Sequence, residues 1–461
     1  MLYFPALSRS ESPLVKSHVE ESLGANPGDA ALNPADSVAM GVPSSRTRER
    51  LGLGAGAFRA LAHRPFRLLF ISFLVNQTGF WVSHISLQGL MVELSQNDTR
   101  QNGLLFFVLF LPAFLLAPIA GVAADRFDRK KIVLTCYASV TVCCGVLTVA
   151  TATDWLTPGR LLAIAFALGL SFAFSGPASH AIAANAVSGA DLPSAVSLQS
   201  AANNLTRVVG PLLAAPLVAT SRFEWSFALY LAAAAIAALL TAGTRINRYR
   251  AEEEAGGIFA RMASGFAHAR ARKPAVPALL TVALLSFFGV SHTVLIPAFA
   301  SDVLGSADYF AWLAAATGLG AMVGALRAGR VGREPSMWRA GRSAFAYGGC
   351  LIAFSLTTDI AAALLTQLFV GYFYFSVMTS LQTLIQQIVD ESKRGRVMSL
   401  FQVAWAGLVP FGSLAMGFLA GSLGPPATIL LGAGVCAVFG FSIAVIFREG
   451  SPWGPRRRVK A

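Results

Sequence analysis

Twelve long apolar stretches, each bounded by short polar or charged segments, run along the chain between residues 66 and 447. A helix of about 20 apolar residues crosses a bilayer core of roughly 30 Å and satisfies its own backbone groups there. The pattern therefore predicts an all-α polytopic membrane protein. The first six spans are expected near 66–94, 101–124, 130–153, 158–186, 194–221 and 223–243. The second six are expected near 277–300, 309–326, 341–358, 360–388, 396–421 and 426–447.

The composition supports this prediction and the charges orient the spans. Hydrophobic residues make up 55% of the 461 residues, charged residues only 13%, and the mean hydropathy is +0.61. With the N-terminus in the cytoplasm, 32 of the 36 lysines and arginines lie on the cytoplasmic side, as the positive-inside rule requires. The net charge of +13 is therefore a topology signal and not a sign of nucleic-acid binding. We expect a bacterial cytoplasmic (inner) membrane protein with both termini in the cytoplasm.

Three segments lie outside the spans. Residues 1–65 are rich in Ala, Ser, Pro and Arg without the apolar core of a signal peptide, which predicts a disordered cytoplasmic tail. Residues 244–276 form a charged linker that is expected to be amphipathic and to lie along the cytoplasmic surface. Residues 448–461 are a basic cytoplasmic tail. The linker divides the spans into two six-helix bundles, 66–243 and 277–447.

The two bundles carry weak internal repeats at nearly one offset. "GVAADRFDRKK" from Gly121 parallels "GALRAGRVGRE" from Gly324, 203 residues later. "AVSGADLPSAVSL" parallels "IVDESKRGRVMSL" at an offset of 202, and "VSHISL" parallels "VSHTVL" at 208. Their shared order and spacing favour a duplicated six-helix unit and two pseudo-symmetric halves.

Six charges crowd into residues 125–131, between two apolar spans, within the pattern G-x-x-x-D-R-x-x-R-K. Twelve helices in two related halves with this loop resemble the major facilitator superfamily. The segments at 191–219 and "TGLGAMVGAL" resemble the branch of enterobactin-type siderophore exporters and macrolide-efflux pumps, whose members imply export by proton antiport. Gly210-Pro211 resembles the start of the antiporter motif, although the usual final Gly-Gly is Ala214-Ala215 here.

The charged loop is a candidate gate. Asp125 follows the small Gly121 by one turn, so a neighbouring helix could offer its N-terminal amides to the carboxylate. Arg126, Arg129 and Lys130 could hold acidic partners on the cytoplasmic rim while the outward-open state lasts, or could be a solvated positive-inside loop. In the second repeat the basic positions recur at Arg330 and Arg333, but Ala328 replaces Asp125.

A polar stripe follows the first span. Its members Gln77, Trp81, His84 and Gln88 are spaced by four, three and four residues and so share a helix face, expected to line a central cavity. His292 occupies the position in the second half that matches His84. Histidine titrates near pH 6.5, so either side chain could couple transport to protons or simply be a neutral, hydrogen-bonded residue.

Further candidates lie at membrane depth. Glu93 near the outer end of the first span and Arg207 in the fifth are ionisable, so Arg207 should have a partner or face water. Tyr372, Tyr374 and Gln382 in the tenth span suit an amphipathic guest with rings and hydrogen-bonding groups, or helix packing.

These features favour a secondary active transporter, a proton-coupled exporter of a small amphipathic metabolite (siderophore-like) or drug (macrolide-like). An importer of a nutrient or organic ion is the alternative, and a non-transporting membrane sensor a third. No nucleophile, paired carboxylates or nucleotide loop predicts an enzyme. The five cysteines lack metal-ligand spacing, so no metal and no cofactor is expected beyond the proton gradient. The expected partners are substrate, protons and lipid, and the expected state is a monomer.

Overall fold

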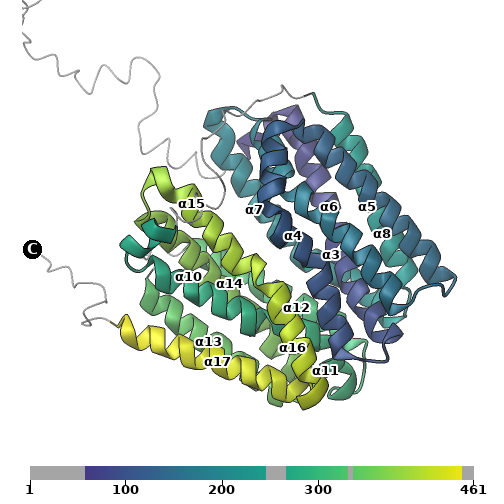
Figure 1. Cartoon of the computed structure of the whole chain (residues 1–461), viewed down its shortest axis with the longest axis vertical. Helices are drawn as coiled ribbons and strands as arrows, with labels where there is room; N and C mark the ends of the chain where they lie inside the picture. Colours follow the sequence, from purple (N-terminus) through teal and green to yellow (C-terminus); the bar gives the residue numbers. More distant parts are fainter. Residues whose placement is uncertain (1–57, 246–265, 331–335, 449–461) are drawn as a thin grey trace, which may run out of the picture. The chain divides into compact units, whose positions relative to one another are not determined.

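The computed structural model describes residues 58–245, 266–330 and 336–448, and all regular elements in these ranges are helical (Figure 1). The predicted N-terminal tail therefore falls mostly outside the described residues. The same holds for most of the linker and of the basic C-terminal tail.

The first bundle contains six long helices, whose bounds match the predicted spans closely. They are α3 (Arg64–Leu94), α4 (Thr99–Arg126), α5 (Arg129–Ala152), α6 (Pro158–Ala184), α7 (Leu192–Ala219) and α8 (Phe223–Ala242). Side-chain caps mark several starts: Asp98 accepts from the amide of Arg100, and Asp128 accepts from the amides of Lys130 and Lys131. Polar residues that end one apolar run thus also begin the next helix.

The second bundle repeats this order with two broken spans. The first broken span comprises α10 (Ala275–Leu284), the π turn η3 (Leu285–Gly289), the 3-10 turn η4 (Val290–Leu295) and α11 (Ile296–Asp302). The second comprises α15 (Glu391–Gln402), the π turn η5 (Val403–Gly407) and α16 (Val409–Leu423). Pro297 and Pro410 lie in the first turn after each irregular stretch, where a missing amide N–H costs least. The continuous helices are α12 (Tyr309–Arg330), α13 (Met337–Leu356), α14 (Ile360–Ile388) and α17 (Pro425–Ile446).

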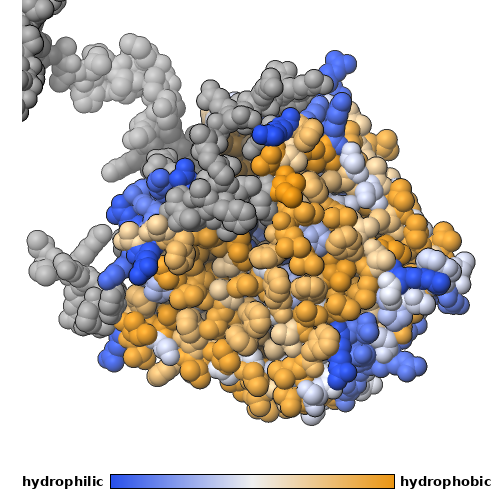
Figure 2. All heavy atoms as spheres, in the orientation of Figure 1, coloured by the Kyte–Doolittle hydropathy of each residue, from blue (hydrophilic) through white to orange (hydrophobic). Residues whose placement is uncertain are grey.

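Among the described residues, ten segments are both long and apolar enough to cross a membrane. The two remaining predicted spans correspond to α7 and α13, which have 28 and 20 residues but are less apolar. The all-helical membrane class is confirmed, and each of the twelve predicted spans coincides with a helical segment. Apolar side chains cover most of the visible helix surface, and hydrophilic ones gather near the helix ends (Figure 2).

Helix packing repeats between the two halves. In the first bundle α4 packs on α6 and α5 on α8; in the second, α12 packs on α14 and α13 on α17. The bundles meet through two equivalent pairs, α4 against α16 and α7 against α12. The second helix of each half therefore contacts the fifth of the other, which is the pairing that a pseudo-two-fold arrangement produces.

Matching ion-pair clusters fasten the start of each bundle, at the end where the basic residues gather and which we call the basic end. In the first bundle the ring of His63 lies 2.8 Å from Asp191, and Arg59 lies 3.4 Å from the same carboxylate. In the second, Arg272 makes two hydrogen bonds of 2.7 Å to Asp390, with His268 at 3.5 Å. Both aspartates precede the fifth helix of their half.

These contacts lower the pKa of both carboxyl groups. For Asp191 the main cause is the hydrogen bond with His63, followed by that from Ser188. For Asp390 it is the hydrogen bond from Arg272. A carboxyl group whose pKa is lowered in the folded state stabilises the fold above its unfolded pKa of about 3.9, and this contribution disappears as pH falls through the folded value.

We therefore expect Asp191→Asn and Asp390→Asn to lower the Tm of the detergent-solubilised protein at pH 7, followed by tryptophan fluorescence. The deficit should shrink below about pH 4, because the wild-type carboxylates also lose their charge there. Asp308→Asn is the matched control, since Asp308 is exposed in a loop and takes part in no ion pair among the described residues. A deficit that is constant with pH would show that charge is not its source.

Candidate substrate and coupling site

The polar stripe of α3 divides between two environments. Trp81 lies at the crossing of α3 and α7, where a Cβ atom at Gly210 would collide with it. His84 and Gln88 are buried inside the first bundle, at 6% and 2% exposure, and not on a surface between the bundles. Gln77 hydrogen-bonds Asn203 of α7 at 3.4 Å. Gln77 and Trp81 thus lie towards α7, whereas His84 and Gln88 lie within the first bundle. The four side chains do not share the single central cavity expected for them.

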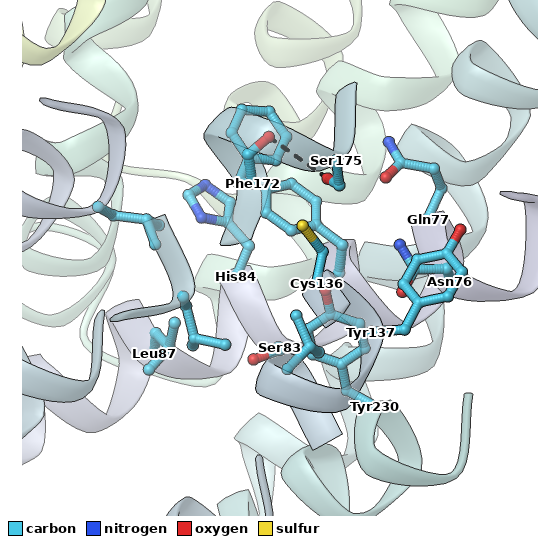
Figure 3. Close-up of a pocket in the computed structure, with 14 residues that line it drawn as sticks. Asn76, Gln77, Ser83, His84, Leu87, Cys136, Tyr137, Phe172, Ser175 and Tyr230 are labelled. Atoms are coloured by element: carbon cyan, nitrogen blue, oxygen red, sulfur yellow. Dashed lines mark hydrogen bonds between the residues drawn. The ribbon is translucent and has the colours of Figure 1, made fainter. Parts of the chain in front are cut away.

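A small polar cavity of about 20 Å³ adjoins His84, with room for about one water molecule (Figure 3). Five helices of the first bundle line it, and its polar members include Asn76, Gln77, Ser83, Tyr137 and Tyr230. The imidazole stacks on Phe80 at 5.8 Å, and its Nε2 lies 3.3 Å from the amide nitrogen of Gln88. His84 Nδ1 has no hydrogen-bond partner within the described chain.

His292 stands in η4 within a chain of hydrogen bonds. Its Nδ1 lies 2.6 Å from the carbonyl oxygen of Gly289, so this nitrogen carries the proton that is donated. Its Nε2 lies 3.4 Å from the amide nitrogen of Gln367 on α14. The amide oxygen of Gln367 accepts from the hydroxyl of Thr317 on α12 at 2.8 Å. Three helical segments therefore meet at this histidine.

Arg207 of α7 lies where the two bundles touch. Its backbone packs against α12, where a Cβ atom at Gly318 would approach the carbonyl oxygen of Arg207 to 2.6 Å. Its guanidinium carbon lies 5.4 Å from the ring centre of Trp81, 5.0 Å from that of Phe375 and 5.7 Å from that of Trp405. We call Arg207 with these three rings the arginine–aromatic cluster.

The predicted residues of the tenth span, α14, also separate. Tyr374 is buried inside the second bundle, 5.6 Å from the ring of Tyr347. Tyr372 packs its backbone against Gly320 and Gly324 of α12. Gln382 is partly buried.

The charged loop makes caps at the basic end. Arg129 donates to the carbonyl oxygen of Ala124 at 2.9 Å, and Lys130 donates to the carbonyl oxygens of Ala242 and Thr244 at 2.8 and 2.7 Å. Basic side chains thus satisfy the final carbonyl groups of α4 and α8.

Several other predicted residues lie in different surroundings. A Cβ atom at Gly121 would meet no atom within 4 Å, and Arg126 is exposed. The side chain of Asp125 lies outside what the structure describes, as does Arg333. Glu93 is exposed at the far end of α3, away from the basic end. Pro211 is buried beside Gly210.

The two bundles are in direct contact at the end opposite to the basic end. The hydroxyl of Thr99 donates to the carbonyl oxygen of Gly417 at 3.0 Å. The amide of Asn102 donates to the carbonyl oxygen of Val294 at 2.6 Å, and that of Asn97 to Asp302 at 2.5 Å. We call these contacts the far-end contacts.

Four side chains of the candidate site escape sequence reasoning. They are Gln367 and Thr317 beside His292, and Phe375 and Trp405 beside Arg207. Polar residues in apolar helices are common enough that Gln367 and Thr317 give no signal of their own. The repeat offset of 202 does align Trp405 with Asn203, one helical turn before Arg207, and this is the available signal.

The fold and the match of residues 55–450 to a transporter family identify a membrane transporter of the major facilitator superfamily. A bacterial homologue of the human lysosomal transporter Spinster, solved inward-facing and unoccupied, matches 84% of this chain and 98% of its own length with a TM-score of 0.64 and 16% identity. A POT family transporter in complex with 5-aminolevulinic acid matches 83% and 96% with a TM-score of 0.67 and 11% identity. At these identities the likeness concerns the fold alone.

The amino-acid sequence identifies the family within this superfamily. The model of the transmembrane secretion effector family matches residues 55–450, and the chain belongs to this family. A staphyloferrin A transporter of Staphylococcus aureus (strain NCTC 8325 / PS 47) is 24% identical over 78% of this chain and 89% of the relative. The enterobactin exporter EntS of Salmonella typhimurium is 25% identical over 83% and 91%. The protein is accordingly a transporter and not an enzyme, and its relatives include siderophore exporters.

Proposed function

We propose that the protein is a proton-coupled exporter that moves a small amphipathic metabolite, siderophore-like or macrolide-like, out of a bacterial cell by alternating access. The observation that carries the proposal is the meeting of two related bundles around Arg207, with the far-end contacts holding one end together. Similarity to transporters of enterobactin and staphyloferrin A supports the substrate type.

The basic end is proposed to face the cytoplasm, because the lysines and arginines gather there. The far-end contacts then belong to a state closed towards the outside. In the opposite state the basic ends would approach each other, and the loop with Asp125, Arg126, Arg129 and Lys130 would act as the gate. Arg129 and Lys130 would exchange their capping contacts for partners across the bundles.

His292 is the proposed proton carrier, because its hydrogen bonds can serve both charge states. When neutral, it accepts at Nε2 from Gln367, whose oxygen accepts from Thr317. When protonated, it would donate from Nε2, and a half-turn of the Gln367 amide would present its oxygen. The Gln367 nitrogen would then donate to Thr317, whose hydroxyl already lies 2.9 Å from the carbonyl oxygen of Leu313. No acidic or basic side chain contacts the ring in the described ranges; Tyr347, beside Gly289, is the nearby titratable group.

We expect His292→Ala and Thr317→Val to flatten the dependence of export on pH between about 5.5 and 7.5, the range in which histidine titrates. Drug or siderophore uptake into everted vesicles at imposed pH gradients measures this. His180→Ala is the control, because His180 also contacts a glutamine, Gln199 at 3.3 Å, away from His292. An unchanged profile in both variants would transfer the role to His84 or Glu93.

The function itself is tested with everted vesicles that contain the full-length protein. The probes are iron-free enterobactin and, separately, erythromycin. Collapse of the proton gradient is the energy control. Accumulation of either probe that needs the gradient supports export. Accumulation only in right-side-out vesicles would favour an importer. A sensor would be favoured if no probe were transported in either orientation while deletion of the gene changed growth in the presence of a probe.

A further inference from the structure

Arg207 is a charged side chain without a counter-charge in the part of the chain that the structure describes. It lies in the middle of α7, fifteen residues from the start of this helix. No carboxylate of the described residues lies near its guanidinium, and its Nε is buried without a hydrogen-bond partner. A charge at this depth is costly unless something compensates for it.

The three rings of the arginine–aromatic cluster provide part of that compensation. All three ring centres lie within about 6 Å of the guanidinium, the range in which cation–π attraction is significant. The rings stabilise the positive charge through their faces but accept no conventional hydrogen bonds. Within the described residues Nε has no hydrogen-bond partner, so donor capacity of the guanidinium remains available. Planar N–H donors in this state match a carboxylate.

The arginine–aromatic cluster also lies between the two bundles. Trp81 and Arg207 come from the first bundle, whereas Phe375 and Trp405 come from α14 and η5 of the second. A molecule bound here touches both bundles, so its release and binding are tied to their relative movement. The residue that corresponds to Arg207 at the offset of 202 is Val409, so the charge is present on one side only.

We propose that the arginine–aromatic cluster recognises the substrate and that the substrate is an organic anion, a molecule that joins a carboxylate to a flat apolar or aromatic body. The carboxylate accepts from the guanidinium, and the flat body packs on Trp405 and Phe375. This inference rests on the proposed transport function and narrows its substrate class. A purely structural cation–π brace between the bundles is the competing role, and it predicts no preference for charge.

The test uses two flat probes that differ in charge, 2-naphthoate and its neutral amide. Binding is measured by calorimetry on the full-length protein in nanodiscs, with empty nanodiscs subtracted. We expect the wild type to bind the acid at least about tenfold more tightly than the amide, the usual effect of one charged hydrogen-bonding group. Arg207→Gln should bring the ratio to about one, and Arg207→Lys should lie between, because lysine keeps the charge without the planar donors.

Two further variants separate recognition from packing. Trp405→Leu should weaken acid and amide alike and keep their ratio. Arg160→Gln is the matched control: Arg160 also lies over a tryptophan, 4.2 Å from the ring centre of Trp155, but in a far-end segment, and its loss should change neither affinity. If Arg207→Gln misfolds, the affinity ratio of acid to amide in Arg207→Lys, which retains the charge, still tests the proposal.

A ratio near one in the wild type, a preference that survives Arg207→Gln, or no binding of either probe to the wild type would overturn the inference. Gradient-driven export in everted vesicles together with such a result would leave the transport function standing. Absence of export in both vesicle orientations would instead remove the function on which the inference rests.

Discussion

Gly417→Leu is expected to leave the protein folded but to favour an open far end and to lower the rate of transport. A Cβ atom at Gly417 would lie 2.7 Å from the carbonyl oxygen of Thr99 and 2.9 Å from the Cα of Gly103. Both are backbone atoms of α4, which cannot move aside locally. Because α16 and α4 belong to different bundles, the clash opposes their contact and not the packing within either bundle.

Overpacking of this kind costs about 1–3 kcal/mol, which shifts the balance between states by roughly fivefold to 150-fold. The shift can be measured by the rate at which an impermeant maleimide labels Asn102→Cys, a position with 1% exposure, after the native cysteines are replaced. We expect faster labelling and lower export than in the parent. Gly434→Leu is the control, because a Cβ atom there would meet nothing within 4 Å. Equal labelling in all three proteins would contradict the assignment of this end as a closed contact.

Gly348→Leu is expected to prevent stable folding of the second bundle. The position faces α17, and a Cβ atom would lie 2.5 Å from the amide nitrogen and 2.7 Å from the Cα of Ala437. The substitution would separate two helices that pack along their length, so the cost should reach or exceed about 3 kcal/mol. Small residues that allow such close approach are a general feature of membrane helix pairs.

The neighbouring glycine supplies a closely matched comparison. Gly349 lies on the same helix, is exposed, and would meet no atom within 4 Å of an added Cβ. Gly349→Leu should therefore behave as wild type. Fluorescence-detected size-exclusion chromatography after stepwise heating measures both; similar losses in the two variants would mean that leucine is harmful for a reason other than the helix contact.

The positions of the spans could be predicted from the sequence because a membrane sets one length for every apolar run. The predicted span 130–153 and the observed α5 (Arg129–Ala152) differ by one residue at each end, and Asp128 supplies the cap that fixes the start. The broken spans were beyond this reasoning. Length and hydropathy predict a continuous helix for an apolar run that contains Pro297 or Pro410. They do not show where the helix changes from α to π or 3-10 geometry.

The candidate site could be predicted from the sequence to a smaller extent than the spans. Trp81 and His84 are three residues apart, which on a helix separates their directions by about 60°. That angle is enough to point Trp81 at Arg207 and His84 into its own bundle, and only packing decides between the two. The partners of Arg207 come from residues 375 and 405, far along the chain, so no local pattern could identify them.

An anionic substrate bound at Arg207, as proposed above, would also have an electrical consequence. If the protein carries an anion outwards while a proton enters, each cycle moves at least two positive charges inwards. The interior-negative membrane potential then contributes about 2.3 kcal/mol for each charge at 100 mV. Export of a monovalent anion would remain favourable even where the pH is equal on both sides, so the voltage alone could keep the transporter running.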